Sequence, residues 1–177
     1  MNKIAKNHTK YNVFKTKWGY FGLAGTENAL LKTCLPMPDS DEVKSLLVKD
    51  LPAAQLDNTI SKDLQAKIVA YFDGGDPVDF TFDIPLALDH FPAFTQKVLT
   101  ACRRVTFGQT ITYSQLAQKA GNPFAARAIG SVMAKNPLPL VIPCHRVLRS
   151  DGKLGGFSAP GGLNTKQKLL QLEHSNL

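Results

Sequence analysis

Three closely spaced prolines constrain one short stretch of this 177-residue chain more than any other feature of the sequence does. The stretch covers residues 136–147 and has prolines at 137, 139 and 143. Proline fixes φ near about −65° and lacks an amide hydrogen, so we expect the stretch to end any preceding helix and to be extended. Cys144 follows the last of these prolines and precedes His145. The sequence therefore predicts a cysteine held by rigid backbone next to a histidine.

Cys144 has two interpretations. The thiolate is the nucleophilic form of cysteine, and neighbouring His and Arg side chains, here His145 and Arg146, lower the pKa of a thiol. Successive side chains of an extended strand point to opposite faces, so His145 would reach the thiol through a bridging water. The alternative is a buried, unreactive cysteine, which is the usual state of a free cysteine. The residues alone leave both open.

The cysteine pattern and the amino terminus bear on the compartment. Cys34, Cys102 and Cys144 are an odd number with no CxxC pair, which argues against a disulfide framework and a zinc ribbon and fits a reducing compartment. The amino terminus has no apolar core of a signal peptide, and no later stretch reaches the length of a membrane span. We expect a cytoplasmic protein, with the nucleus as the alternative, and no membrane association.

Charge is distributed unevenly along the chain. Residues 1–94 contain 10 basic and 12 acidic residues, a net charge of −2, whereas residues 95–177 contain 11 basic and 2 acidic residues, a net charge of +9. A one-sided positive field of this kind suits a polyanionic partner such as nucleic acid. A solvated basic surface without a partner is the alternative.

Residues 1–90 are predicted to form an α/β domain. Residues 11–16 and 18–24 are rich in β-forming side chains and have glycines at 19, 22 and 25, which predicts a hairpin or meander. Apolar residues at 60, 64, 68 and 72 predict an amphipathic helix that ends at residues 73–75. Residues 76–85 contain two prolines and are expected to be an extended connection, and we place a domain boundary near residue 90.

Residues 91–177 are predicted to be mostly helical. A first helix starts near Pro92 and turns Cys102 into the core. Thr112 and Gln115 form a capping box that opens a short helix, which Gly121 closes. Asn122 and Pro123 are then expected to cap and begin a second helix that runs to about residue 135. Two helices joined by so tight a turn are typical of a helix-turn-helix motif.

The second of these helices has one apolar face and one face of small residues around an arginine. The apolar face has Ile129, Val132 and Met133, and the other face has Ala126, Arg127, Gly130, Ser131 and Ala134. Small side chains allow a close approach of the backbone, either to another helix or to a nucleic-acid groove. The basic surroundings favour the groove.

The carboxyl-terminal region supplies a carboxylate and a glycine-rich loop. Asn164 and Gln167 resemble a capping pair that begins a helix, on which Glu173 shares a face with Leu169 and Leu170. A carboxylate on an apolar face needs a partner, and a histidine suits it, whereas exposure at a frayed terminus is the alternative. Residues 150–162 lack the spacing of a phosphate-binding loop, and we interpret them as a flexible wall beside the cysteine or as an ordinary surface loop.

Residues 94–173 resemble the O6-alkylguanine-DNA alkyltransferases, also called methylated-DNA–protein-cysteine methyltransferases. The resemblance rests on ordered motifs: residues 112–117, residues 121–128, Asn136 leading into residues 143–147, residues 161–163, and the helix that ends at Glu173. The first ninety residues match only in general character. The resemblance implies a ribonuclease H-like α/β domain followed by a mostly α, winged helix-turn-helix-like domain. It implies no cofactor, and Cys34, His8 and His90 show no spacing of metal ligands.

The resemblance also implies roles for individual residues. Cys144 would accept the alkyl group irreversibly in a single turnover, and Glu173, His145 and a water would deprotonate it. Asn136 would bond to the cysteine loop and the helix-turn-helix. Tyr113 would promote base flipping and donate to the purine N3. The remaining implied site residues form two groups. Those that would contact DNA are Thr112, Ala126, Arg127, Gly130 and Ser131, with Arg127 as the finger that enters the base stack. Those that would line the base pocket are Met133, Val147, Phe157 and Ser158.

The implied substrate is double-stranded DNA bearing O6-alkylguanine, bound through the minor groove by a monomer, with O4-alkylthymine as a further candidate. Phe157 stands where many members have tyrosine, and Ala159 and Pro160 lengthen the loop. Two other functions remain open: an alkyltransferase-like or regulatory DNA-binding protein without transfer chemistry, and a cysteine hydrolase that uses Cys144, His145 and Glu173.

Overall fold

The computed structural model describes residues 8–74, 77–78, 80 and 84–174. These residues form two compact units. The first unit contains the described residues up to Val78 together with residues 84–90, and the second contains Phe80 and residues 91–174. Residues 76, 79 and 81–83 of the connection expected over 76–85 lie outside the described residues.

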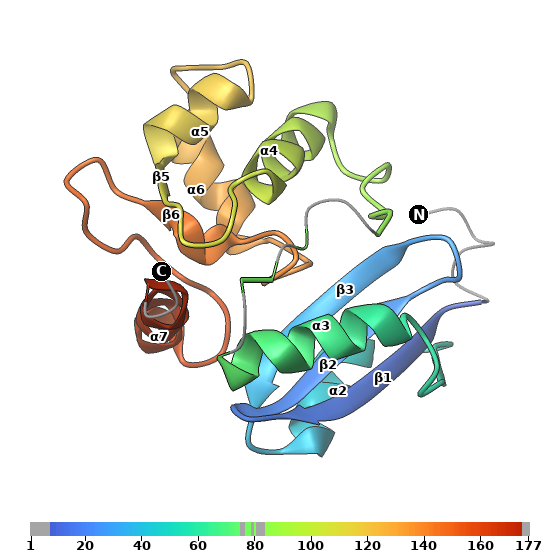
Figure 1. Cartoon of the computed structure of the whole chain (residues 1–177). Coiled ribbons are helices and arrows are strands. Elements are labelled where there is room, and N and C mark those ends of the chain that lie inside the picture. The colour runs from blue at the N-terminus through green and yellow to red at the C-terminus, as the bar shows by residue number, and fades with distance from the viewer. Residues whose placement is uncertain (1–7, 75–76, 79, 81–83, 175–177) are drawn as a thin grey trace. The chain divides into compact units, whose positions relative to one another are not determined.

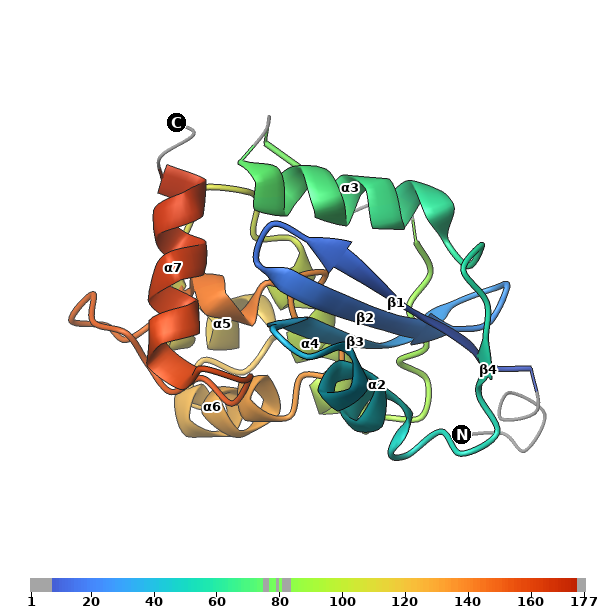
Figure 2. The same ribbon diagram turned by 90° about the horizontal axis from the view of Figure 1, so that it is seen from below.

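The first unit contains a four-stranded sheet. Figures 1 and 2 show a helix on each face of this sheet. The sheet order is β3-β2-β1-β4; β2 pairs antiparallel with both β1 and β3, and β4 pairs parallel with β1. The strands and helices have the following bounds: β1 Lys10–Thr16, β2 Gly19–Gly25, β3 Leu30–Met37, α2 Ser40–Val48, β4 Gln55–Leu56 and α3 Lys62–Asp73. The predicted hairpin is confirmed as β1 and β2, and the predicted helix as α3.

Strand β3 and helix α2 were not expected from the sequence. Pro36 within β3 weakens its strand pattern, and α2 buries only Val43 and Leu47. Two signals do mark α2: Asp39 accepts a hydrogen bond from the amide of Asp41 as a helix cap, and the two buried residues are four positions apart.

Both faces of this sheet are packed closely. Phe21 and Phe72 are buried between the sheet and α3, with ring centroids 6.1 Å apart, and Trp18 lies 5.3 Å from Phe72. On the other face, a side chain at Gly22 would reach within 2.8 Å of Val43, so glycine at this position lets α2 approach the sheet. The core of the first unit thus forms without any of the predicted site residues.

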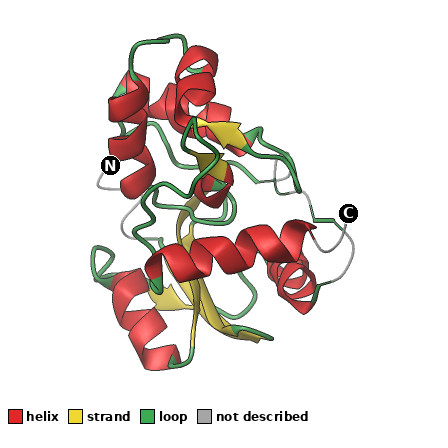
Figure 3. Ribbon diagram, turned by 90° about the vertical axis from the view of Figure 1, so that its left-hand side faces the viewer, coloured by secondary structure: helices red, strands yellow, loops and turns green. Residues whose placement is uncertain are grey.

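The second unit is mostly helical (Figure 3) and contains a sheet of two short strands. Its elements are α4 Ala93–Arg103, β5 Ile111–Thr112, α5 Tyr113–Lys119, α6 Ala126–Ala134, the 3₁₀ helix η1 Cys144–Arg146, β6 Val147–Leu148 and α7 Gly162–His174. Strands β5 and β6 pair in parallel, so the start of α5 lies beside the segment that follows β6. The capping box at Thr112 and Gln115 is confirmed, and Cys102 is fully buried as expected.

Three expectations about this unit are wrong. Helix α6 begins at Ala126 rather than at Asn122 and Pro123, because the amide of Ala125 donates to the Asn122 carbonyl (3.1 Å) and closes a turn there. Residues 136–147 are not extended throughout: Leu140 has a φ of 77°, and Cys144–Arg146 form η1. Helix α7 begins at Gly162 and places Asn164 inside the helix, since the chain turns at two glycines with positive φ.

None of the helices in the described part of the chain is long and apolar enough to cross a membrane.

Candidate active site

The cysteine loop holds Cys144 in a nearly closed environment. The residues of η1 are 7% (Cys144), 1% (His145) and 3% (Arg146) exposed. The side chain of Asn136 ties the loop together, because its Nδ2 donates to the Ile142 carbonyl (2.8 Å) and its Oδ1 accepts from the Leu138 amide (3.0 Å). Buried apolar side chains before Cys144 and the pairing of β6 after it complete the support. The position of the thiol is therefore set by the loop on both sides.

Glu173 on α7 is the centre of a buried ion cluster. Its carboxylate lies 2.7 Å from Nε2 of His145. The carboxylate also accepts two hydrogen bonds from Arg146, from Nε at 2.9 Å and from Nη2 at 2.8 Å. A further hydrogen bond comes from the Gly108 amide at 3.3 Å. Arg146 also donates to the Val105 carbonyl and lies over the Phe107 ring. Glu173 is completely buried, so the alternative of an exposed terminal carboxylate is excluded.

The cluster fixes the charge of both its acid and its base. Burial alone would raise the pKa of Glu173, but hydrogen bonds and charges from His145 and Arg146 outweigh burial and hold the pKa at about 2. Burial, together with the positive charges of Arg146 and Lys166, lowers the pKa of His145, although the Glu173 carboxylate acts to raise it. At neutral pH the pair is therefore an ionised carboxylate beside a neutral imidazole.

These charges determine the tautomer of His145. An ionised carboxylate only accepts hydrogen bonds, so Nε2 of His145 carries the proton and donates it to Glu173. Nδ1 is then the basic nitrogen. The arrangement is that of a general base whose orientation is fixed by a carboxylate.

The expectation that His145 and Arg146 lower the pKa of Cys144 is wrong. Burial raises the pKa of the Cys144 thiol, in spite of a hydrogen bond from Asn136, the positive charge of Lys166 and hydrogen bonds from the backbone at Cys144 and His145, which act to lower it. The reason is that the side chains of His145 and Arg146 turn to Glu173. The resting thiol is protonated at neutral pH, and a reaction at this sulfur needs a base.

Lys166 is a further buried charge that the sequence analysis missed. It is fully buried on α7, and its Nζ donates to the Val147 carbonyl at 2.6 Å and to the Gly155 carbonyl at 3.4 Å. It joins the backbone after Cys144 to the glycine-rich loop. The signal was present in the sequence, because Lys166 precedes Leu169 by three residues and Glu173 by seven and so shares their helical face.

A hollow of about 450 Å³ brings together four of the predicted site residues. Tyr113, Ala126, Arg127 and Gly130 line it, together with residues of the loop after β6: Arg149, Ser150, Gly155 and Gly156. Tyr113 packs so closely on Gly155 that a side chain there would overlap its hydroxyl. Burial raises the pKa of Tyr113, and negative charge on Cys144 raises it further.

The other predicted site residues are placed as follows. Thr112 caps α5, and Ser131 is exposed on α6. Met133 and Val147 are buried, whereas Phe157 is half-buried. Ser158 donates its hydroxyl to the Ala134 carbonyl at 2.7 Å, which attaches the glycine-rich loop to the end of α6. None of the residues in this paragraph lines the 450 Å³ hollow.

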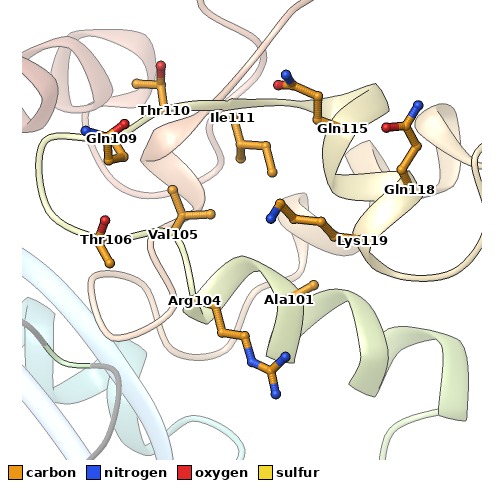
Figure 4. A pocket seen from close by; sticks show the side chains of 10 residues that line it. All are labelled: Ala101, Arg104, Val105, Thr106, Gln109, Thr110, Ile111, Gln115, Gln118 and Lys119. Atoms are coloured by element: carbon orange, nitrogen blue, oxygen red, sulfur yellow. The ribbon is translucent and has the colours of Figure 1, made fainter.

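A second hollow of the same unit, of about 590 Å³, lies between α4, α5 and the segment that joins them (Figure 4). Its floor is apolar, with Ala101, Val105 and Ile111, and Lys119 extends across it. None of the predicted site residues lines it. Within the described residues, no group of three or more histidine, cysteine and acidic side chains could hold a metal ion.

Comparison with known proteins identifies the family. A family model described as "6-O-methylguanine DNA methyltransferase, DNA binding domain" matches residues 93–175. A methylated-DNA–protein-cysteine methyltransferase of Cricetulus griseus is 37% identical in an alignment that covers 93% of this chain and 81% of that protein. The chain belongs to the methylated-DNA–protein-cysteine methyltransferase family.

Alignments with two further proteins cover different shares of the chain. The Mus musculus protein of the same name is 48% identical over 52% of this chain and 46% of its own length, so this alignment spans about half of that relative. The crystal structure of Mycobacterium tuberculosis OGT in complex with DNA matches 94% of each chain, with a TM-score of 0.75 and 30% identity. The match thus includes the first unit as well as the second.

Proposed function

We propose that this chain repairs DNA by transferring a methyl or other alkyl group from O6 of guanine to Sγ of its own Cys144. The observation that carries the proposal is the buried pair of His145 and Glu173, 2.7 Å apart, beside a cysteine whose own pKa is raised. A thiol that is protonated at rest needs a base that is neutral at rest, and His145 has that state. Membership of the methyltransferase family supports the same reaction.

The proton leaves the thiol before the alkyl group arrives. In the proposed step, Nδ1 of His145 takes the Cys144 proton through a water molecule, and the resulting imidazolium is stabilised by the Glu173 carboxylate. The thiolate then attacks the alkyl carbon, a C–S bond forms, and the C–O bond breaks with its electron pair remaining on guanine. Tyr113 donates to N3 of the leaving guanine. The product is a thioether without a leaving group, so each molecule reacts once.

The open hollow beside the cysteine loop fits the DNA in this proposal. The bound DNA is double-stranded, bears O6-alkylguanine, and enters by its minor groove against the small residues of α6, with Arg127 taking the place of the flipped base. Thr112 and Ser131 flank this contact. The Cys144 and Val147 carbonyls read the exocyclic amine, the Ser158 amide faces O6, and Phe157 and Met133 complete the base pocket.

We also assign a domain type to each half of the chain, and an oligomeric state and a cellular location to the protein. Residues 1–90, which hold the first unit, are assigned as a ribonuclease H-like domain, and residues 91–177 as a winged helix-turn-helix-like domain whose recognition helix is α6. The protein acts as a monomer in the cytoplasm without a cofactor. The +9 net charge of residues 95–177 supports a polyanionic partner for the second unit.

An intact-mass measurement tests the transfer. The protein is incubated with an excess of duplex oligonucleotide containing O6-methylguanine, and we expect a mass increase of one methyl group. Cys144→Ala should abolish the increase. Cys34→Ala is the matched control, because Cys34 lies in the first unit and is half-buried, and it should acquire the same single methyl group as the parent.

Two results would refute the proposal in different ways. An unchanged mass with retained binding to the duplex would indicate a DNA-binding protein without transfer chemistry. Release of more product than protein present would indicate a cysteine hydrolase that regenerates Cys144.

A further inference from the structure

The turn between α5 and α6 presents an aromatic side chain that the rest of the unit leaves uncovered. Phe124 is 97% exposed, whereas the next most exposed large apolar side chain among the described residues, Leu56, is 69% exposed. Single exposed apolar residues are common on protein surfaces and need no explanation by themselves. The exposure of Phe124 is nearly complete, however, and its position in the fold indicates what the ring could contact.

The turn holds Phe124 on a rigid support. Pro123 precedes it and fixes the backbone, and the Ala125 amide closes the turn on the Asn122 carbonyl at 3.1 Å. The Asn122 amide in turn donates to the Ala117 carbonyl at 2.9 Å, which attaches the turn to the end of α5. Because the backbone is already ordered, contact through this ring would cost little further conformational entropy.

The turn leads directly into the helix face of the proposed DNA contact. Ala126 and Arg127, which line the 450 Å³ hollow with Tyr113, follow Phe124 by two and three residues. The charge of the surroundings also suits DNA, since no acidic residue occurs in the sequence between Asp89 and Asp151. An anionic duplex that lies on α6 therefore meets no opposing charge from the turn or its neighbours in sequence.

We propose that Phe124 is a DNA contact, whose ring packs against deoxyribose groups of the minor groove beside the lesion. The contact rests on the proposed function, because it requires a duplex on α6. Proteins that bind the minor groove use apolar side chains, phenylalanine among them, against sugars and unstacked bases. Such a contact buries apolar surface and neutralises no phosphate. Phe124 therefore strengthens binding without adding to its salt dependence.

Salt-dependent binding measurements test this contact. Affinity for a duplex with O6-methylguanine is measured over a series of salt concentrations in the Cys144→Ala background, which prevents transfer. We expect Phe124→Ala to weaken binding about tenfold at every salt concentration, from the loss of one buried aromatic side chain, and to leave the slope of log K against log salt unchanged. Phe124→Lys should steepen that slope by about one, because it adds a phosphate contact.

Two controls separate the contact from effects on folding. Leu56→Ala removes an exposed apolar side chain from the first unit and should leave both the affinity and the slope as in the parent. With Cys144 intact, Phe124→Ala should react with free O6-alkylguanine base at the parent rate, because no duplex is involved.

Three outcomes would overturn the inference. One is a Phe124→Ala affinity equal to that of the parent, and another is a slope altered by this substitution. The third is loss of self-association in sedimentation without a change in DNA affinity, which would make the ring a contact between copies of the chain. If instead the parent itself neither binds the duplex nor gains a methyl group, the proposed function fails, and the inference fails with it.

Discussion

The ion cluster around Glu173 and the hollow beside Tyr113 belong to the same unit but differ in where their charges find partners. In the cluster, His145, Arg146 and Glu173 are at most 3% exposed, and their charges are satisfied within the chain. In the hollow, Arg127 is exposed, and the described residues offer it neither a hydrogen bond nor an ion pair. The cluster is complete before any substrate arrives, whereas the hollow has a charge available for a molecule from outside.

This difference separates two tasks. A base that must take a proton from a buried thiol works best when its orientation and its surrounding dipoles are already fixed, since they then need no rearrangement during the reaction. A surface that receives a flexible polyanion gains from exposed basic and small side chains. Substitutions in the cluster should therefore change stability first, and substitutions in the hollow should change reaction with duplex DNA at nearly constant stability.

We expect the largest loss of stability from removing the charge of Glu173, the acidic side chain of the cluster. Glu173→Gln leaves Arg146 buried without its counter-charge, which we expect to lower the free energy of unfolding by about 3–5 kcal/mol in urea denaturation. The matched control is Asp151→Asn, which removes an exposed ion pair with Arg149 and should cost less than about 1 kcal/mol. In the double variant Arg146→Met/Glu173→Gln, part of the loss should be recovered, because the buried charge is gone. Equal costs for Glu173→Gln and Asp151→Asn would remove the distinction between the two regions.

Acid should weaken the cluster in a defined range. The pKa of Glu173 is lowered from its ordinary value of 4.5 to about 2 by His145 and Arg146, in spite of its burial. Its contribution to stability is therefore complete above about pH 4.5 and is lost as the pH falls towards 2, by an amount on the order of 3 kcal/mol. The lowered pKa of His145 acts in the same direction, since the unfolded chain takes up its proton first.

Unfolding in urea at about pH 6 and about pH 3 measures this loss. Glu173→Gln serves as the comparison, because its stability should fall less between the two pH values than that of the parent. Parallel losses in both proteins would show that other carboxylates account for the acid sensitivity.

Much of this arrangement could be predicted from the sequence because local rules determine it. The capping box at Thr112 positions α5, and the helical spacing of Leu169 and Glu173 turns the carboxylate inward. Partners far apart in sequence could not be predicted. The spacing gives no sign that Arg146 binds the carboxylate 27 residues later, or that Lys166 reaches the Val147 carbonyl.

The turn before α6 also could not be predicted from its residue types. Asn122 and Pro123 carry the residue types of a helix start, yet Asn122 closes a turn with Ala125. The same residue types serve both structures, and packing decides between them. The raised pKa of Cys144 was likewise beyond prediction, because it depends on burial and on where its neighbours' side chains turn.

The smallest expected effect concerns the hollow. In Gly155→Ala, the new Cβ would lie 2.6 Å from Cε2 of Tyr113 and overlap its hydroxyl, so the ring must move. We expect single-turnover methyl transfer from duplex DNA to slow about tenfold, because a displaced group loses its alignment with the reacting base. Stability in urea should change little, since the end of a half-buried side chain can move aside. Gly156→Ala is the neighbouring control, because a side chain there meets nothing within 4 Å, and its effect on transfer should be smaller.

A double variant decides whether the tyrosine transmits this effect. In Tyr113→Ala the ring is absent, so a methyl group at position 155 has nothing to displace, and adding Gly155→Ala should slow transfer no further. If the two substitutions instead multiply, the glycine acts on the loop backbone, for example through the bond from Lys166 to the Gly155 carbonyl. The hollow would then depend on the buried lysine for its shape, and the separation between a fixed interior and an open surface would not hold at this residue.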